Sequence, residues 1–304
     1  MIPFQVQNQF AFLDKERNIQ VYIKREDLIH PFVSGNKFRK LKYNLAEAKK
    51  RNFDTLLTFG GAFSNHIAAV AATGKLEGFK TIGIIRGEEL AIETNGNPTL
   101  KFASENGMQF EFVSREQYRT KTATDFLLHL KQKFGAFYLI PEGGTNELAV
   151  KGCTEILTEE DKAFDFIACA VGTGGTISGI IESASLHQQI LGFPALKGEF
   201  LQNEIRNFVT KSNWHLIKGF EFGGYAKLTT ELIVFMNDFL AETQVLLDPI
   251  YTAKMVFGVK SLIQDGFFPN DSKILLIHTG GIQGIEGMNQ FLEKKKLPKI
   301  NKND

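Results

Sequence analysis

The sequence has few cysteines, no long apolar run and almost no net charge, and each absence excludes a class of protein. The 304 residues include two cysteines, Cys153 and Cys169, too few for a disulfide framework or a four-ligand zinc site. Lys plus Arg numbers 35 and Asp plus Glu numbers 34, so a net charge of +1 gives no electrostatic footprint for nucleic acid or an anionic membrane. No apolar stretch approaches the ~18 residues of a membrane helix. Since we also recognise no signal peptide, we expect a cytoplasmic protein with no nucleic-acid or membrane partner.

The sequence does contain a regular alternation of short strands and helices. Hydrophobic residues make up 43% of the chain and charged residues 23%, the balance of a globular protein. Short β-rich or apolar runs predict strands at residues 21–24, 55–59, 81–85, 110–113, 136–140, 164–171 and 274–277. Apolar residues at helical spacing predict helices over 37–51 and 64–76. This order is typical of an α/β fold with parallel sheets covered by helices.

Two polar stretches fall outside this alternation. Residues 87–98 contain Asn-Gly and Asn-Pro pairs and predict an exposed loop. The lysine-rich stretch 293–304 predicts a solvated, frayed terminus, which we favour over a polyanion-binding tail.

A glycine-rich segment follows the buried strand predicted at 164–171 and precedes a probable helix. Its glycines allow a close approach of the backbone to an anion, and its threonines add hydroxyl donors. The residues concerned are Gly172, Thr173, Gly174, Gly175 and Thr176. The segment lacks the lysine of a nucleotide-binding P-loop and differs in spacing from a dinucleotide-binding motif. Taken alone, a plain tight turn explains it equally well.

Lys37 lies close to the start of the helix predicted over 37–51, where Ser34 or Asn36 can act as the N-cap. A positive helix end and partial burial both disfavour the ammonium form of such a lysine. The neutral amine that results is the form a Schiff-base lysine requires. The alternative is an ordinary surface lysine, because most lysines of a globular chain are surface charges.

Two further segments place polar side chains at the ends of predicted strands. Ser64, Asn65 and His66 follow a Gly-Gly pair, where Ser64 could also be a simple N-cap and His66 a hydrogen-bonded structural residue. Tyr251 follows Asp-Pro-Ile and precedes a helix, so it could serve as a general acid or base or as a packed aromatic.

Taken together and in this order, the segments resemble fold-type II pyridoxal-phosphate (PLP) enzymes, within the group of 1-aminocyclopropane-1-carboxylate (ACC) deaminase and D-cysteine desulfhydrase. The matching motifs are K-R-E-D at 24–27, G-N-K-F-R-K-L at 35–41, S-N-H at 64–66, P-E-G-G at 141–144, V-G-T-G-G at 171–175, D-P-I-Y at 248–251 and H-T-G-G at 278–281. The resemblance implies two open, three-layer α/β domains of the tryptophan synthase β type. It also implies PLP as cofactor, a small amino acid as substrate and a homodimer.

The resemblance further implies roles for individual residues. Lys37 matches the lysine that forms the internal aldimine, and Asn65 matches the residue that binds the phenolic oxygen of the cofactor. Ser64 matches the residue that contacts the substrate carboxylate. The other matches are the phosphate cup from Gly172 to Thr176, the active-site tyrosines Tyr251 and Tyr225, and the cofactor-facing Thr252 and Thr279.

Thr252 is the departure from the family pattern that bears most on the reaction, because ACC deaminases have glutamate there, facing the pyridine nitrogen. A carboxylate keeps that nitrogen protonated, whereas a hydroxyl offers a neutral hydrogen bond and leaves a weaker electron sink. We therefore favour a D-cysteine desulfhydrase-like β-elimination, giving pyruvate, sulfide and ammonia. The alternatives are ACC deaminase, giving 2-oxobutyrate and ammonia, a D-serine-type dehydratase, or a non-catalytic PLP-binding protein. Phe63, Ser34 and residues 226–229 also depart from the family and reshape the pocket.

For the domains, we expect a small α/β domain over residues 50–137. A larger PLP-binding domain would combine residues 1–49 with residues 138–304, and the cofactor would lie in the cleft between the two.

Overall fold

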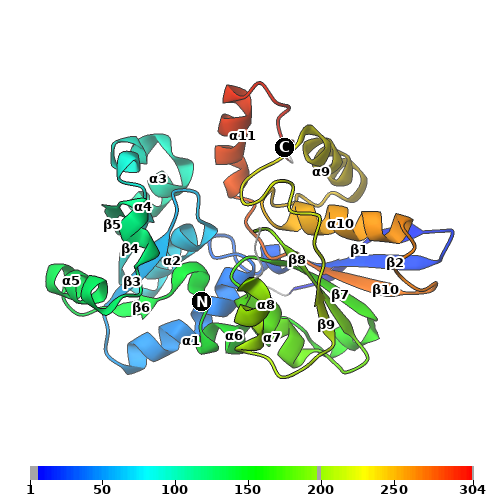
Figure 1. Cartoon of the computed structure of the whole chain (residues 1–304), viewed down its shortest axis with the longest axis horizontal. Coiled ribbons are helices and arrows are strands. Elements are labelled where there is room, and N and C mark those ends of the chain that lie inside the picture. The colour runs from blue at the N-terminus through cyan, green and yellow to red at the C-terminus, as the bar shows by residue number, and fades with distance from the viewer. Residues whose placement is uncertain (1–5, 197–199, 303–304) are drawn as a thin grey trace.

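The computed structural model describes residues 6–196 and 200–302, and it contains two separate β-sheets (Figure 1). The larger sheet has the strand order β1-β2-β10-β7-β8-β9. All its neighbouring strands are parallel except β1 and β2, which are antiparallel. Its strands are β1 (Asn8–Asp14), β2 (Ile19–Lys24), β7 (Phe166–Val171), β8 (Gln189–Pro194), β9 (Trp214–Leu216) and β10 (Lys273–Ile277).

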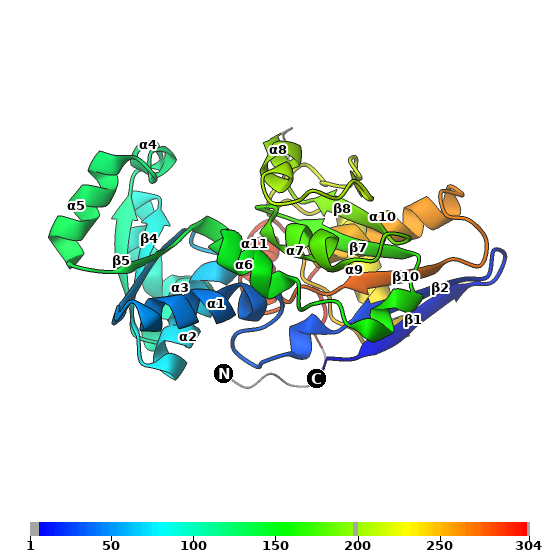
Figure 2. The same ribbon diagram turned by 90° about the horizontal axis from the view of Figure 1, so that it is seen from below.

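The smaller sheet is wholly parallel and has the order β5-β4-β3-β6. Its strands are β3 (Thr55–Gly60), β4 (Lys80–Arg86), β5 (Met108–Val113) and β6 (Tyr138–Ile140). Figure 2 shows the two sheets on opposite sides of the molecule, with α1 (Asn36–Lys50) and α6 (Glu147–Cys153) between them. The α/β fold with parallel sheets is therefore confirmed.

The remaining helices cover the sheets or connect their strands. They are α2 (Asn65–Glu77), α3 (Pro98–Glu105), α4 (Arg115–Arg119), α5 (Thr124–Phe134), α7 (Gly175–Ser183), α8 (Phe200–Arg206), α9 (Thr230–Thr243), α10 (Thr252–Gln264) and α11 (Gly284–Lys294). Short 3-10 helices are η1 (Glu26–Leu28), η2 (Glu88–Gly96), η3 (Glu142–Gly144) and η4 (Glu159–Ala163). None of the described helices is long and apolar enough to cross a membrane.

The central strands are recognisable from sequence because both of their faces are covered. Every residue of β3 is buried, and β7 is buried from Ile167 to Val171. Strands that pack on both faces read as continuous apolar runs rather than as alternating ones. Separate clusters of buried side chains line the two faces of each sheet, so the chain builds its core in layers.

Two of the sequence predictions are wrong in part. The stretch predicted as an exposed loop over 87–98 is largely exposed where its side chains are described, but it holds η2, and Pro98 is already the first residue of α3. The lysine-rich terminus is largely solvated as far as the structure describes it, but it is anchored rather than frayed at Ile300, which is 3% exposed. The backbone N–H and C=O of Ile300 both bond to the Asn289 side chain, each at 2.9 Å.

The strand pairing in the smaller sheet indicates where the boundary between the two domains lies. We propose that the smaller domain, expected over residues 50–137, extends through β6, because Leu56 to Thr58 of β3 pair with Tyr138 to Ile140 of β6. The larger domain would then consist of the six-stranded sheet and the helices packed on it.

Candidate active site

The loop before Lys37 is pinned between two distant segments of the chain. Gly35 has φ +61°, and a Cβ there would lie 1.9 Å from the carbonyl oxygen of Thr279, so only glycine fits. The Gly35 N–H donates to the Glu26 carbonyl at 2.9 Å, and the Asn36 N–H donates to the Thr279 carbonyl at 3.2 Å. The K-R-E-D and H-T-G-G motifs therefore fix the first turn of α1, which carries Lys37.

Lys37 opens onto a cavity between the two sheets, and most of the predicted site residues line that cavity. The predicted residues that line it are Lys37, Asn65, Gly172, Thr173, Gly174, Thr176, Tyr251 and Thr279. Gly175, Ser64, Tyr225 and Thr252 are not part of the lining. A larger open hollow between α8 and β9 contains none of the predicted residues.

The Lys37 amine is held in a setting that favours its neutral form. Burial, with a smaller contribution from the nearby Lys40 charge, lowers the pKa of Lys37 to about 7. Its Nζ lies 3.3 Å from Asn36 Oδ1, the one hydrogen-bond acceptor found for it among the described residues. A lysine with this pKa is largely available as a nucleophile and a base near neutral pH.

Lys40, one helical turn further along α1, is a site residue that the sequence motifs did not single out. It is 2% exposed, and its Nζ donates to the Gly143 carbonyl at 2.9 Å and to Thr145 Oγ1 at 2.9 Å. Thr173 Oγ1 lies 3.5 Å away, and a Cβ on Gly175 would lie 3.3 Å from the same ammonium. Lys40 forms no ion pair within the described part of the chain, and burial lowers the pKa of its amine, so an anion bound at the glycine-rich loop would stabilise the charged form.

The glycine-rich loop is shaped for an anion. Gly174 has φ +83° and is the N-cap of α7, whose first backbone N–H groups lack partners within the helix. Thr176 Oγ1 accepts a hydrogen bond from Asn36 Nδ2 at 2.8 Å, which ties the loop to the turn that carries Lys37. The free amides, the threonine hydroxyls and the Lys40 ammonium together suit a phosphate group.

Asp248 organises the start of α10. Its Oδ1 accepts the backbone N–H groups of Ile250, Tyr251 and Thr252 at 3.1, 2.6 and 3.3 Å. Its Oδ2 has no hydrogen-bond partner among the described residues, and burial raises the pKa of this carboxyl to about 7. Asp248, the first residue of the D-P-I-Y motif, therefore sets the backbone of Tyr251 and Thr252, a role that the motif alone did not assign.

Thr252 carries a second unpaired buried group. The residue is 1% exposed, and its Oγ1 has no hydrogen-bond partner in the described part of the chain. Leaving a buried hydroxyl unpaired costs about 1–3 kcal/mol, so such a group is a candidate for contact with a bound molecule.

The two predicted tyrosines lie together. The rings of Tyr225 and Tyr251 meet edge to face with centroids 6.1 Å apart. Lys254, two residues after Thr252, donates to the carbonyls of Glu221 and Gly224 at 2.9 and 2.8 Å and so holds the loop that carries Tyr225. Tyr225 does not line the cavity itself; its connection to the site is its ring contact with Tyr251.

The start of α2 supports the neighbouring wall of the cavity. Ser64 is the N-cap, and its Oγ accepts the backbone N–H groups of His66 and Ile67 at 3.2 and 3.4 Å. Asn65 lines the cavity, and its Oδ1 accepts a hydrogen bond from Gln283 Nε2 at 3.3 Å. His66 is 2% exposed and bonds to Thr58 Oγ1 at 2.8 Å, as expected of a structural histidine.

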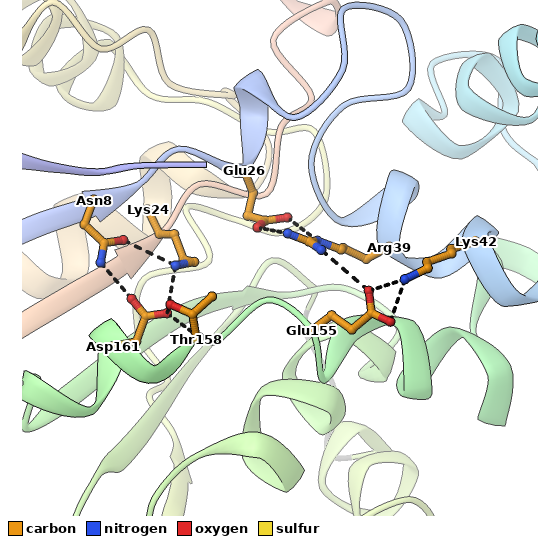
Figure 3. Close-up of polar contacts among 8 residues, drawn as sticks. All are labelled: Asn8, Lys24, Glu26, Arg39, Lys42, Glu155, Thr158 and Asp161. Atoms are coloured by element: carbon orange, nitrogen blue, oxygen red, sulfur yellow. Dashed lines mark hydrogen bonds and ion pairs between the residues drawn. The ribbon is translucent and has the colours of Figure 1, made fainter. Parts of the chain in front are cut away.

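Buried ion pairs hold the K-R-E-D segment in place (Figure 3). Arg39 of α1 makes two hydrogen bonds to the Glu26 carboxylate, at 2.9 and 2.8 Å. Lys24 pairs with Asp161 at 2.7 Å. Since Glu26 also accepts the Gly35 N–H through its backbone, the first pair clamps the Lys37 turn from both sides.

These observations fit PLP, which presents a phosphate, an aldehyde and a pyridine nitrogen. A phosphate would meet Lys40 and the glycine-rich loop, an aldehyde would meet a lysine amine that is neutral near pH 7, and an unpaired hydroxyl is available for the ring nitrogen. A lysine of this kind, beside groups suited to a phosphate and a ring nitrogen, is what a PLP-dependent enzyme requires.

Comparison with known proteins agrees. The family model described as "Pyridoxal-phosphate dependent enzyme" matches residues 8–280, and the chain belongs to this family. It is 30% identical to a putative 1-aminocyclopropane-1-carboxylate deaminase of Thermotoga maritima over 94% of each chain. It is 31% identical to a bifunctional D-cysteine desulfhydrase/1-aminocyclopropane-1-carboxylate deaminase of Arabidopsis thaliana, covering 88% of this chain and 73% of that protein.

Two further matches complete the comparison. A D-cysteine desulfhydrase of Serratia proteamaculans is 28% identical over 86% of each chain. A crystal structure of an ACC deaminase homologue superposes with a TM-score of 0.79 at 28% identity, over 93% of this chain and 91% of that one. The fold of PLP-dependent enzymes and the PLP cofactor are therefore confirmed, and the chain is a PLP-dependent enzyme.

Proposed function

We propose that the enzyme catalyses a β-elimination on a small amino acid of the D-cysteine type, giving pyruvate, sulfide and ammonia. The observation that carries this proposal is Thr252, a buried residue with an unpaired hydroxyl directly after the active-site tyrosine. A neutral hydroxyl at the pyridine nitrogen leaves that nitrogen largely unprotonated, which suffices for loss of a thiolate. Relatives that bear the name D-cysteine desulfhydrase support the same reaction.

PLP supplies the electron sink, and the chain supplies binding groups and proton transfer. Lys40, Thr173 and the start of α7 would hold the phosphate, and Asn65 would hold the phenolic oxygen. Thr279 would contribute to the cavity wall beside the Lys37 turn.

Proton transfer would fall to Lys37 and Tyr251. The Lys37 amine, neutral near pH 7, would take the Cα proton of the substrate. Burial raises the pKa of Tyr251 well above its ordinary value, so its phenol keeps its proton and can donate it at the leaving group. Ser64 and the backbone N–H of Asn65, at the start of α2, would bind the substrate carboxylate.

The test is the turnover of D-cysteine by the holoenzyme. Sulfide and pyruvate should appear in equal amounts, and Lys37→Ala should produce neither above the rate of free PLP. D-Serine in a parallel reaction tests the dehydratase alternative, since that activity would release pyruvate without sulfide. Failure of D-cysteine to give pyruvate would contradict the proposal.

ACC deamination is the second candidate, supported by the names of the Thermotoga and Arabidopsis relatives. We also propose a homodimer, to be tested by light scattering as twice the mass of one chain. A cytoplasmic location is proposed as well, supported by two cysteines that are both free and buried.

A further inference from the structure

Arg86 is a charged residue at the rim of the cleft to which nothing above gives a role. It is the last residue of β4, at the carboxyl end of the strand, and it is exposed. The register pairs its neighbour Ile85 with Gly60 of β3, from which the chain runs on to Ser64. A Cβ on Gly61 would lie 3.7 Å from Arg86 Nη2, so the guanidinium lies against the loop that leads to the proposed carboxylate site.

The neighbours of Arg86 leave its charge unbalanced. Its guanidinium carbon lies 5.7 Å from the centroid of the Tyr118 ring. The Tyr118 hydroxyl donates to Glu142 at 2.7 Å, and Lys121 pairs with the other oxygen of Glu142 at 3.1 Å. The Glu142 carboxylate is thus already engaged, and Glu89 pairs with Arg115. Arg86 forms no ion pair with any residue that the structure describes.

A chain of neighbouring residues connects Arg86 to the cavity, although Arg86 does not line the cavity itself. Burial raises the pKa of Tyr225. The Arg86 charge is close enough to lower this pKa, and the Glu142 charge is close enough to raise it. Tyr225 in turn contacts Tyr251, which lines the cavity. Gly143, the residue after Glu142, lines the cavity as well. A substrate side chain that extends from the cavity toward the rim would therefore meet Arg86.

We propose that Arg86 binds an oxyanion on the side chain of the substrate, so that the leaving group of the preferred amino acids carries a carboxylate, phosphate or sulfate. This inference rests on the proposed function, because it assigns a side-chain subsite to the same cleft. The guanidinium presents a planar fork of N–H donors that matches an oxyanion with two hydrogen bonds. D-Cysteine and ACC carry no side-chain oxyanion, so both would bind without the contribution of this fork.

The test compares aspartate with asparagine, which have the same shape and differ in side-chain charge. Binding of each enantiomer to the holoenzyme is measured by calorimetry. One enantiomer of aspartate should bind about tenfold or more tightly than the matching asparagine, the effect of one charge-assisted hydrogen bond. Arg86→Gln should abolish this preference. Lys80→Gln removes a positive charge from the opposite end of the same strand and should leave the preference intact.

Three outcomes would overturn the inference. Aspartate and asparagine could bind the unaltered enzyme equally, or aspartate could fail to bind at millimolar concentration. Arg86→Gln could also weaken both ligands by the same factor, which would assign Arg86 to the α-carboxylate instead.

The keto-acid assay with D-cysteine separates this inference from the proposed function. If D-cysteine gives pyruvate but aspartate binds no more tightly than asparagine, the proposed reaction is supported and the subsite is refuted. If the enzyme yields no keto acid from D-cysteine but prefers aspartate over asparagine, and this preference depends on Arg86, the subsite is supported and the proposed reaction is refuted.

Discussion

The rings of Tyr225 and Tyr251 meet edge to face, with 66° between their planes, although they come from different segments of the chain. Lys254 explains how this contact is kept, because its ammonium holds the Tyr225 loop against the helix that starts beside Tyr251. Burial raises the pKa of both phenols. Both therefore remain protonated at neutral pH and can act as hydrogen-bond or proton donors.

Removing the Tyr251 hydroxyl should lower kcat without unfolding the protein. Tyr251→Phe keeps the ring contact with Tyr225 and deletes the proton donor, so kcat should fall about 10²-fold or more, as for loss of a general acid. Tyr22→Phe, which deletes a hydroxyl in the larger sheet that bonds to Gln20 at 3.3 Å, is the matched control. An unchanged kcat in Tyr251→Phe would assign this tyrosine to packing.

Replacing Lys37 should abolish the absorbance band of the bound cofactor. Lys37→Ala removes the one amine of the α1 first turn that lines the cavity beside the glycine-rich loop. Lys49→Ala removes an exposed amine from the last turn of the same helix and should retain the band. A band of full strength in Lys37→Ala would refute the assignment of this lysine.

The pH dependence of cofactor uptake should report the pKa of Lys37. Only the neutral amine attacks an aldehyde, so the rate of uptake should rise with pH around a midpoint of about 7. Lys40→Met removes a cation that lowers this pKa, so the midpoint should move upward. Pyridoxal is the suitable probe because it lacks the phosphate that Lys40 would bind. A midpoint near that of an ordinary lysine would contradict the account.

Breaking the Glu26–Arg39 pair should destabilise the protein. Glu26 is fully buried, so Glu26→Gln leaves Arg39 without its main counter-charge and should lower the free energy of unfolding by about 3–5 kcal/mol. Glu111→Gln breaks a partly exposed pair with Lys133 and should cost about 1 kcal/mol or less. Urea unfolding of both variants makes the comparison, and equal losses would show that burial of the pair has no special effect.

The sequence predicted the parts of this molecule that depend on local pattern. The strands β3 and β7 were predictable because burial on both faces produces unbroken apolar runs. The cavity-lining positions of Lys37, Asn65 and Thr173 were predictable because each lies in a motif at the end of a strand or the start of a helix. Three strands, β1, β8 and β9, were missed, and the three residues of β9 are too few to show a period.

The features that the sequence did not predict depend on contacts between distant segments. Lys40 meets Gly143 and Thr173 only because the two sheets close on α1. Asp248 is recognisable as an anchor only once its three backbone donors are in place. A residue's own neighbours in sequence do not encode such contacts, so motif and spacing cannot reveal them.

The measurement that tests the account most directly is identification of the keto acid formed from D-cysteine and from ACC in separate reactions with the purified holoenzyme. The account assigns a neutral hydrogen bond to Thr252 and so predicts pyruvate from D-cysteine and no product from ACC. Formation of 2-oxobutyrate from ACC would show that a hydroxyl at the pyridine nitrogen suffices for ring opening, and it would contradict the role given to Thr252.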